Sequence, residues 1–220
     1  MPDLNTRIHL DMWRSYKDRN SFLSRIPRAV RTLFKPDNVY GNEWGDPEVV
    51  PPLRFVRDRY VLPHVSSEKI GLEIGAGGGR WTKYLLAFRK LYIVDYHTEL
   101  LQELRKNFDR PNMKFIKNNG CDFPAVPKES VDFVFSFGCF VHLDAGLIKE
   151  YLGNLKDILK PGGSALIHYS DKTKLMAQIN PGFSDNTPTL MRQMVLDAGF
   201  RIVEEDLTTM WHSSIIRFTH

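Results

Sequence analysis

The chain has 220 residues, an apolar fraction of 42% and a formal net charge of +4 at pH 7. This length suits one domain with an added cap, and no apolar run reaches the roughly eighteen residues that a membrane-spanning helix needs. The N-terminus lacks the apolar core of a signal peptide, and the only cysteines, Cys121 and Cys139, form no metal-type pair, so we expect a cytoplasmic protein.

The positive charge is concentrated in residues 1–39, which carry the whole surplus. Basic residues there are Arg7, Arg14, Lys17, Arg19, Arg25, Arg28, Arg31 and Lys35, against Asp3, Asp11, Asp18 and Asp37. Residues 6–34 are predicted to be helical with a break at Pro27, because apolar residues recur at helical spacing. We expect a solvated helical cap. The alternatives are a basic arm that binds nucleic acid and an interfacial helix that contacts a membrane surface.

A loop rich in proline, glycine and acids follows at residues 36–52. Long irregular segments inside compact chains are often functional lids. Tyr40 and Trp44 are candidates for stacking on a sugar ring or a cofactor, or for anchoring the cap. Residues 53–62 predict a helix, so we divide the chain into a cap and lid, 1–62, and a main domain, 63–220.

From residue 69 onward, short apolar runs alternate with helical segments. Strands are expected near 69–74, 91–95, 113–116, 131–137 and 163–169, and helices near 80–88, 97–107, 145–159 and 187–198. This alternation predicts an α/β domain with a parallel sheet and helices on both faces. The last helix ends at the stop signal Ala198-Gly199. The two runs after it, 200–203 and 213–218, predict an antiparallel pair.

A glycine-rich turn follows the first strand, in the stretch Ile70-Gly71-Leu72-Glu73-Ile74-Gly75-Ala76-Gly77-Gly78-Gly79-Arg80-Trp81. Its glycines let the backbone approach a ligand closely, and the following helix would present its N–H groups there. An ordinary tight turn is the alternative. The dinucleotide-binding fingerprint needs Gly or Ala at its sixth position, where this chain has Arg80, so that fingerprint fails.

The order acid–any–Gly–any–Gly–any–Gly, from Glu73 to Gly79, instead resembles the first motif of class I S-adenosylmethionine-dependent methyltransferases. The resemblance extends over residues 69–219. It includes the segments Leu91–Asp95, Asn118–Pro124, Ser130–Gly138 and Leu159–Ile167. It implies a Rossmann-like, doubly wound, seven-stranded sheet whose last strand is antiparallel, and S-adenosylmethionine as the cofactor.

The resemblance also implies the cofactor contacts. Asp95 would accept hydrogen bonds from the ribose hydroxyls, and Tyr96 would pack on the adenine. The family often has Asp where this chain has Asn119, in the loop that borders the adenine. The expected cofactor-binding residues are Glu73, Gly75, Ala76, Gly77, Gly79, Trp81, Asp95, Tyr96, Asn119, Gly120, Cys121, Ser136 and Phe137.

The turn after the fourth strand bears on the methyl acceptor. It lacks the Asn/Asp-Pro-Pro-aromatic sequence of enzymes that methylate the amino groups of bases. This absence argues against methylation of adenine or of cytosine N4 in DNA. It holds His142, whose neutral imidazole suits removal of a hydroxyl proton near neutral pH. The alternative is a polar residue packed under the next helix. Asp144 would either orient the ring or cap that helix.

The segment Ser130–Asp144 looks most like methyltransferases that act on small molecules, particularly on sugar hydroxyls. Further candidates for lining an acceptor pocket, or for packing on the cap, are Tyr40, Trp44, His168, Tyr169, Asp171, Trp211 and His212. No spacing of Asp and His demands a metal, so no metal ligand is assigned. The alternative is a divalent metal that binds two vicinal hydroxyls, which some sugar methyltransferases use. We therefore predict an O-methyltransferase acting on a saccharide or another hydroxylated metabolite. An RNA or protein methyltransferase and a non-catalytic cofactor-binding partner are the alternatives.

Overall fold

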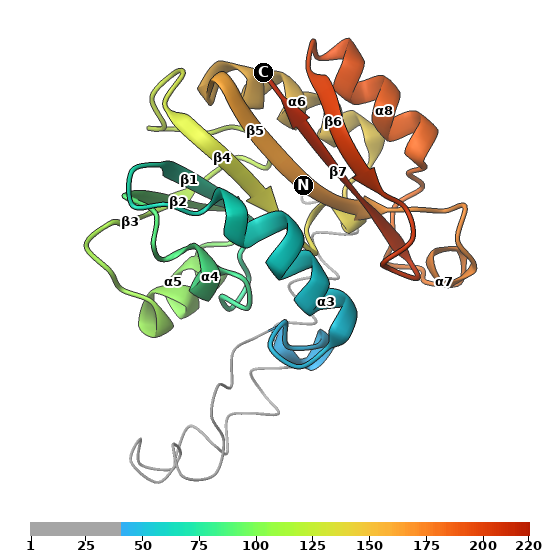
Figure 1. The fold of residues 1–220 in the computed structure, drawn as a ribbon, viewed down its shortest axis with the longest axis horizontal. Coiled ribbons are helices and arrows are strands. Elements are labelled where there is room, and N and C mark those ends of the chain that lie inside the picture. Colours follow the sequence, from blue (N-terminus) through green and yellow to red (C-terminus); the bar gives the residue numbers. More distant parts are fainter. Residues whose placement is uncertain (1–40) are drawn as a thin grey trace, which may run out of the picture.

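The structure, a computed structural model, describes residues 41–220 and is built on a seven-stranded sheet of order β3-β2-β1-β4-β5-β7-β6 (Figure 1). The strands are β1 Ile70–Ile74, β2 Lys90–Asp95, β3 Met113–Lys117, β4 Val131–Ser136, β5 Leu159–Ser170, β6 Arg201–Asp206 and β7 Ser213–Thr219. The helices are α3 Pro51–Val56, α4 Thr82–Leu85, α5 Thr98–Asn107, α6 Ala145–Ile158, α7 Leu175–Gln178 and α8 Pro188–Asp197. The helix predicted at 6–34, and with it the cap, lies outside the described residues.

Strands β1 to β5 run parallel to one another, whereas β7 lies antiparallel between β5 and β6. This topology confirms the predicted Rossmann-like, doubly wound sheet with an antiparallel last strand. The chain order reverses between β1 and β4, which are neighbours in the sheet. Ligands of open α/β sheets bind at the carboxyl ends of the strands, at such a switch point. The loops after β1, β2 and β4 are therefore the place to look for a site.

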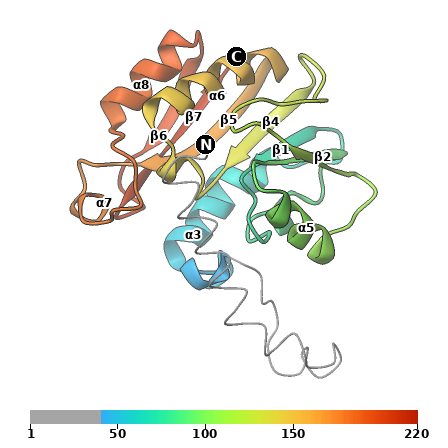
Figure 2. The same cartoon turned by 180° about the vertical axis from the view of Figure 1, so that it is seen from behind.

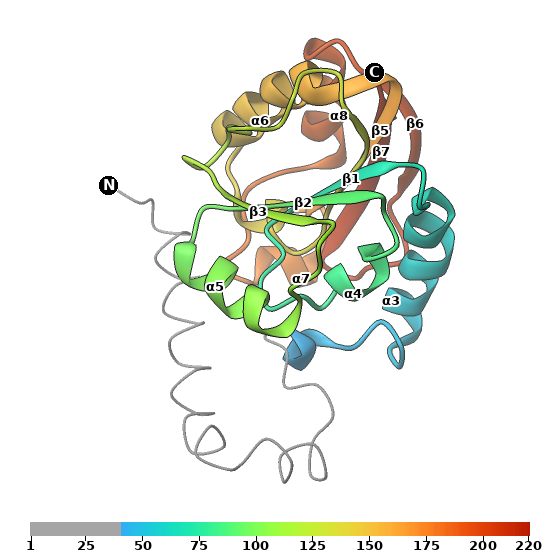
Figure 3. The same cartoon turned by 90° about the vertical axis from the view of Figure 1, so that its left-hand side faces the viewer.

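Helices cover both faces of the sheet, as Figures 2 and 3 show from two sides. On one face, α6 and α8 pack on the sheet, and α6 contributes Ile148, Leu152 and Leu155 at helical spacing. On the other face, α3, α4 and α5 enclose a second apolar cluster that includes Leu85 and Leu104. Burial between these layers holds the strands in register and thereby fixes where their carboxyl ends lie.

The helix predicted at 80–88 is much shorter than expected. It is the single turn α4, with irregular turns before and after it. The side-chain amide of Asn112 donates to the carbonyl oxygens of Leu86, at 3.1 Å, and Phe88, at 2.6 Å, in the irregular turn after α4. The Phe88 ring then fills the space beside Gly71, where a Cβ would lie 2.4 Å from it. The prediction of a long helix after the glycine turn was therefore wrong.

The helix predicted at 53–62 is also divided. After α3 the chain continues in a wide helical turn, Arg57–Val61, and a 3₁₀ turn, Leu62–His64. Leu53, Val56 and Val61 belong to the same apolar cluster as the sheet. The division of the chain at residue 62 stays a prediction. No helix within residues 41–220 is long and apolar enough to cross a membrane.

Candidate active site

The glycine turn between β1 and α4 adopts backbone conformations that residues with a Cβ rarely reach. Gly75, Gly77 and Gly79 have φ angles of 69°, 56° and 102°. A Cβ on Gly75 would lie 2.6 Å from the Cβ of Cys139, and one on Gly79 would lie 2.4 Å from the Phe108 ring. The turn is thus packed against the loop after β4 and the end of α5, and both outer positions require glycine.

Glu73 lies beneath this turn, near the end of β1. Its side chain is buried, and the Thr82 hydroxyl donates a hydrogen bond of 2.6 Å to its Oε2. Burial raises the pKa of Glu73 to about 8. The carboxyl therefore connects β1 to α4 from inside the protein. Ala76, in the turn itself, is buried in the apolar cluster on the same side.

Asp95 ends β2 and is buried beside the glycine turn. The backbone N–H of His97 donates to its Oδ1 at 2.8 Å, and burial raises the pKa of Asp95 to about 7. Among residues 41–220, only backbone N–H groups donate to this carboxylate. A ribose diol offers the hydroxyl donors that such a carboxylate accepts. The residues at this strand end therefore fit an adenosine-type cofactor.

The loop after β3 approaches the residue that follows Asp95. Gly120 has a φ of 118°, and a Cβ there would lie 3.8 Å from the Tyr96 ring. The side-chain oxygen of Asn119 accepts from the backbone N–H groups of Cys121 and Asp122, each at 3.1 Å. Asn119 thus shapes its own loop, which passes beside Tyr96 as the predicted adenine contacts require.

Aromatic side chains pack at the end of β4. The Phe137 ring stacks on His168, with ring centroids 3.9 Å apart, and contacts Trp81 at 4.6 Å. Ser136 is fully buried, and its hydroxyl donates to the Ile74 carbonyl at 2.9 Å. The indole N–H of Trp81 has no hydrogen-bond partner among the described residues. Ser136, Phe137 and Trp81 thus fix the carboxyl ends of β1 and β4 relative to each other.

His142 lies in the 3₁₀ turn Phe140–His142 that follows this strand end. Its Nδ1 lies 2.6 Å from the carbonyl oxygen of Gly182. A carbonyl only accepts, so Nδ1 carries the proton of the neutral ring and Nε2 carries the lone pair. Burial lowers the pKa of His142, which favours this neutral form. Asp144 does not orient the ring: its Oδ1 accepts from the Leu147 N–H at 2.9 Å and caps α6.

Two further histidines approach from β5 and from the start of β7. His168 accepts from the Gly138 N–H through Nδ1 at 3.1 Å, and its Nε2 bonds to the Ser213 hydroxyl. The His212 ring lies 6.0 Å from His168 and 5.1 Å from Phe183. Phe183 also contacts His142, with ring centroids 5.6 Å apart. The structure therefore gathers three predicted residues, His142, His168 and His212, at adjoining strand ends.

Other predicted acceptor residues lie elsewhere. Tyr169 is fully buried in the cluster under α6 and α8. It points to the opposite face of the sheet from His168, because successive side chains of a strand alternate between the two faces. Trp211 is 78% exposed at the surface. Trp44 is exposed in the 3₁₀ turn Asn42–Trp44, and Tyr40 lies outside the described residues. Asp171 is buried and accepts from the Ser214 hydroxyl at 2.6 Å.

Some residues of the site have no motif in the sequence. Gly182 and Phe183 come from the irregular segment between α7 and α8, and only the folded chain places them beside His142. Arg80 is buried next to Phe137, although the sequence reveals only that it breaks the dinucleotide fingerprint. Within residues 41–220, no group of three or more His, Cys, Asp or Glu side chains is arranged to hold a metal ion.

Comparisons with known proteins agree with this geometry. Residues 72–163 match the family model described as a methyltransferase domain. A comparison with curated proteins finds no match. Among solved structures, an S-adenosylmethionine-dependent methyltransferase from Mesorhizobium loti aligns over 79% of this chain and 100% of its own, with 12% identity and a TM-score of 0.65.

Two further solved structures share the fold. The glycopeptide N-methyltransferase MtfA, complexed with S-adenosyl-L-methionine, aligns over 69% of this chain and 81% of its own, with 14% identity and a TM-score of 0.56. The Haloferax volcanii complex of a methyltransferase with the Trm112 methyltransferase activator aligns over 75% of this chain and 88% of the other, with 18% identity and a TM-score of 0.61. At these identities the likeness establishes the fold. Together with the match of residues 72–163 to a methyltransferase domain, it supports a methyltransferase with S-adenosylmethionine as its cofactor.

Proposed function

We propose that this protein is an O-methyltransferase that methylates a hydroxyl group of a saccharide or another small hydroxylated metabolite, with His142 as the general base. The observation that carries this proposal is the 2.6 Å contact between Nδ1 of His142 and the Gly182 carbonyl. It assigns the proton to Nδ1 and leaves Nε2 as the nitrogen that accepts one.

A general base has a clear task in this chemistry. A sugar hydroxyl keeps its proton near neutral pH and is a poor nucleophile. A base that takes the proton during attack contributes about 10²–10⁴-fold to the rate. His142 suits the task because burial lowers its pKa, so that the ring is unprotonated at physiological pH. When bound, S-adenosylmethionine supplies a methyl group already activated by the sulfonium, so the protein's remaining task is alignment.

The residues at the ends of β1 to β4 would hold the cofactor. Asp95 would accept from the ribose hydroxyls, and Tyr96 would pack on the adenine beside the loop Asn119–Cys121. The glycine turn would let its backbone approach the cofactor closely. Ser136, Phe137, Glu73 and Trp81 are buried, so their contribution is to keep these strand ends in position. The side chains of Ser136 and Glu73 are also hydrogen-bonded within the protein.

His168 and His212 would border the acceptor. Both nitrogens of His168 are engaged, by Gly138 and Ser213, which makes it a shape-determining wall rather than a second base. The Nδ1 of His212 is buried without a hydrogen-bond partner among the described residues, and is a candidate contact for an acceptor hydroxyl. The lid aromatics Tyr40 and Trp44, and Trp211 at the surface, remain proposed sugar contacts.

The test compares wild-type protein with His142→Ala and a remote control, His220→Ala, in transfer of a labelled methyl group to a panel of hydroxylated acceptors. His142→Ala should lower kcat by about 10²–10⁴-fold and leave the affinity for S-adenosylhomocysteine, measured by calorimetry, nearly unchanged. The decrease of kcat at acidic pH that is expected for wild-type protein should be absent in His142→Ala. Retained kcat would disprove the base role, and absence of transfer to every hydroxylated acceptor would disprove the substrate assignment.

A second candidate is an RNA or protein methyltransferase, favoured by the basic surplus of residues 1–39. Phosphate contacts make polyanion binding depend steeply on salt. This reading predicts salt-sensitive binding of a single-stranded RNA that disappears when residues 1–35 are removed. Salt-insensitive or unchanged binding after the truncation would leave the small-molecule acceptor as the better proposal.

A further inference from the structure

Arg80 is a buried cation beside the candidate active site that the cofactor and base assignments do not use. Arg80 directly follows Gly79, the last glycine of the turn, and is 9% exposed. The guanidinium lies over the Phe137 ring, 5.7 Å from its centroid. It donates one long hydrogen bond of 3.4 Å to the Gly45 carbonyl. A guanidinium has five N–H donors, so most of its capacity remains unused by residues 41–220.

No carboxylate within residues 41–220 pairs with Arg80 at 4.0 Å or less. The two acids that act on it from a distance are Glu43 and Asp46. Glu43 accepts from the Gly41 N–H at 2.8 Å, and Asp46 is paired with Lys83 at 3.1 Å. Because burial is not offset by a partner, the pKa of Arg80 falls to about 10. Buried charges are usually paired, so this one calls for an anion.

The guanidinium has glycines on two sides. An added Cβ on Gly41 would lie 3.6 Å from the Arg80 Cβ, and one on Gly138 would lie 3.6 Å from its Nη2. Both glycines have φ angles, 106° and 84°, that other residues rarely adopt. Gly138 is also the residue whose N–H donates to His168. Arg80 therefore faces the turn after β4, whose Gly138 N–H donates to His168 on β5.

The charged neighbours of that histidine are cations. After burial, the groups that lower the pKa of His168 are two neighbouring histidines, Arg80 and Lys174. The two histidines are neutral, because burial lowers their pKa values, and Lys174 is offset by Asp171, whose carboxylate lies 3.7 Å from the ammonium. Arg80 is therefore the cation beside this histidine that no carboxylate within residues 41–220 offsets.

We propose that the acceptor carries an anionic oxygen group, a carboxylate or a phosphate, and that the buried guanidinium of Arg80 binds it and aligns the acceptor hydroxyl with His142. The planar fork of arginine matches such groups through two parallel hydrogen bonds. Arg80 is therefore a specificity-determining residue, which would favour acidic sugars or sugar phosphates over neutral ones. This inference rests on the proposed methyl transfer to a small hydroxylated acceptor.

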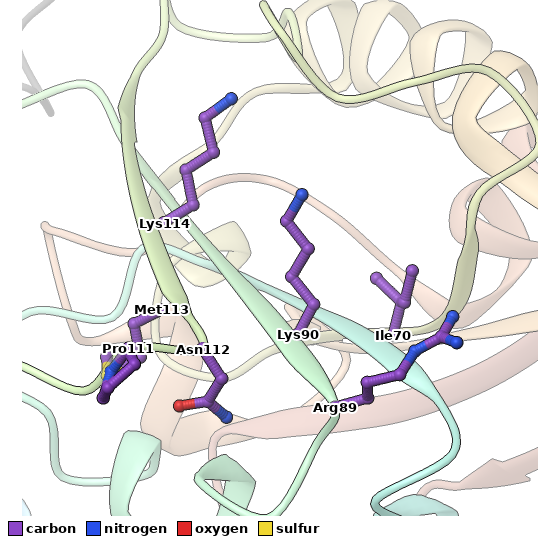
Figure 4. Close-up of a pocket in the computed structure, with 7 residues that line it drawn as sticks. All are labelled: Ile70, Arg89, Lys90, Pro111, Asn112, Met113 and Lys114. Atoms are coloured by element: carbon purple, nitrogen blue, oxygen red, sulfur yellow. The ribbon is translucent and has the colours of Figure 1, made fainter.

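The test uses inorganic phosphate as the probe, on full-length protein saturated with S-adenosylhomocysteine. Thermal unfolding is followed as phosphate replaces chloride at constant ionic strength. The variants are Arg80→Gln, Arg80→Lys and the control Arg89→Gln. Arg89 lines a hollow of about 560 Å³ with Lys90 and Lys114, near the amino ends of β1 to β3 and away from the candidate site (Figure 4). That hollow is the competing basic site for phosphate.

Phosphate should stabilise the loaded wild-type protein with a saturable dependence. Arg80→Gln should weaken the apparent phosphate affinity about tenfold or more, because a charge-assisted bidentate contact is lost. Arg80→Lys keeps the charge and should retain part of the effect, and Arg89→Gln should behave as wild type. Glucuronate should then bind the loaded protein more tightly than glucose, and Arg80→Gln should remove the difference.

Three results would overturn the inference. Stabilisation that survives in Arg80→Gln but disappears in Arg89→Gln would place the anion in the hollow of Figure 4. A second such result has two parts: phosphate stabilises only the unloaded protein, and Arg80→Gln weakens the binding of S-adenosylhomocysteine but not of methylthioadenosine. It would assign Arg80 to the carboxylate of the cofactor. No phosphate effect on loaded wild-type protein would also refute it. Failure of wild-type protein to bind S-adenosylhomocysteine would instead contradict the proposed function.

Discussion

Glu73 makes the stability of this protein depend on pH in a direction unusual for an acid. Burial is the largest cause and raises its pKa from 4.5 to about 8, although the hydrogen bond from Thr82 opposes the change. At neutral pH the folded chain therefore holds a proton on Glu73 that the unfolded chain releases. The stability due to this group is fully present below about pH 4.5 and is lost as the pH rises toward 8.

The magnitude follows from the same linkage. Each pH unit between 4.5 and about 8 should lower the free energy of unfolding by about 1.4 kcal/mol, up to roughly 5 kcal/mol in total. Glu73→Gln keeps the shape of the side chain and can still accept from Thr82, but it does not titrate. The free energy of unfolding of the variant, relative to that of wild-type protein, should therefore increase steadily as the pH rises from 5 to 8.

The assay is urea unfolding followed by circular dichroism at pH 5, 6, 7 and 8. Wild-type protein, Glu73→Gln and the exposed control Glu68→Gln are compared without ligand. The pKa of Asp95 is also raised by burial. The free energy of unfolding of Glu73→Gln should therefore still fall with pH, with a smaller slope than in wild-type protein. Parallel curves for wild-type protein and Glu73→Gln would refute the reasoning, because they would show that Glu73 is ionised in the folded state.

Two further predictions concern the glycine turn and the end of β2. Gly79→Ala should destabilise the protein by about 2–4 kcal/mol, since its φ is 102° and the new Cβ would lie 2.4 Å from Phe108; Gly153→Ala, in α6 with no heavy atom within 4 Å, should be neutral or stabilising by up to about 1 kcal/mol. Equal urea midpoints for the two variants would contradict this. Asp95→Asn should weaken S-adenosylhomocysteine binding at least about tenfold, because the hydrogen bonds from the ribose hydroxyls to an ionised carboxylate are lost. Unchanged affinity by calorimetry would show that Asp95 is not part of the cofactor site.

Local patterns account for the parts of the fold that were predicted well. The strands ending at Ile74 and Asp95 are short apolar runs closed by turn residues or an acid, and the helix α6 shows its apolar face directly in its spacing. The helix after the glycine turn was overestimated because the chain turns toward β2 soon after α4, where the Arg89 N–H donates to the Lys69 carbonyl at 2.9 Å. This contact with a distant segment has no signature within the predicted helix itself.

The candidate site divides in the same way. Asp95 and the glycines can be found from the sequence because their spacing along one strand–turn–helix unit is fixed by local geometry. The role of Asp144 could not be decided, since capping α6 and orienting His142 require the same residue at the same place. Tyr169 and His168 are adjacent in sequence, and only the sheet determines that His168 faces the site while Tyr169 is buried on the opposite face.

The sequence by itself determined the strand and helix alternation, the conformation of the glycine turn and the cofactor class, because each depends on residues close together in the chain. Only the tertiary structure decided which side chains meet across the site. The Gly182 carbonyl that sets the proton on His142 comes from 40 residues further along the chain. Arg80 becomes a buried cation, unpaired with any carboxylate of residues 41–220, only when Gly45 and Phe137 pack against it. Burial and charge pairing are properties of the packed chain, and the proposed contacts with the acceptor depend on them.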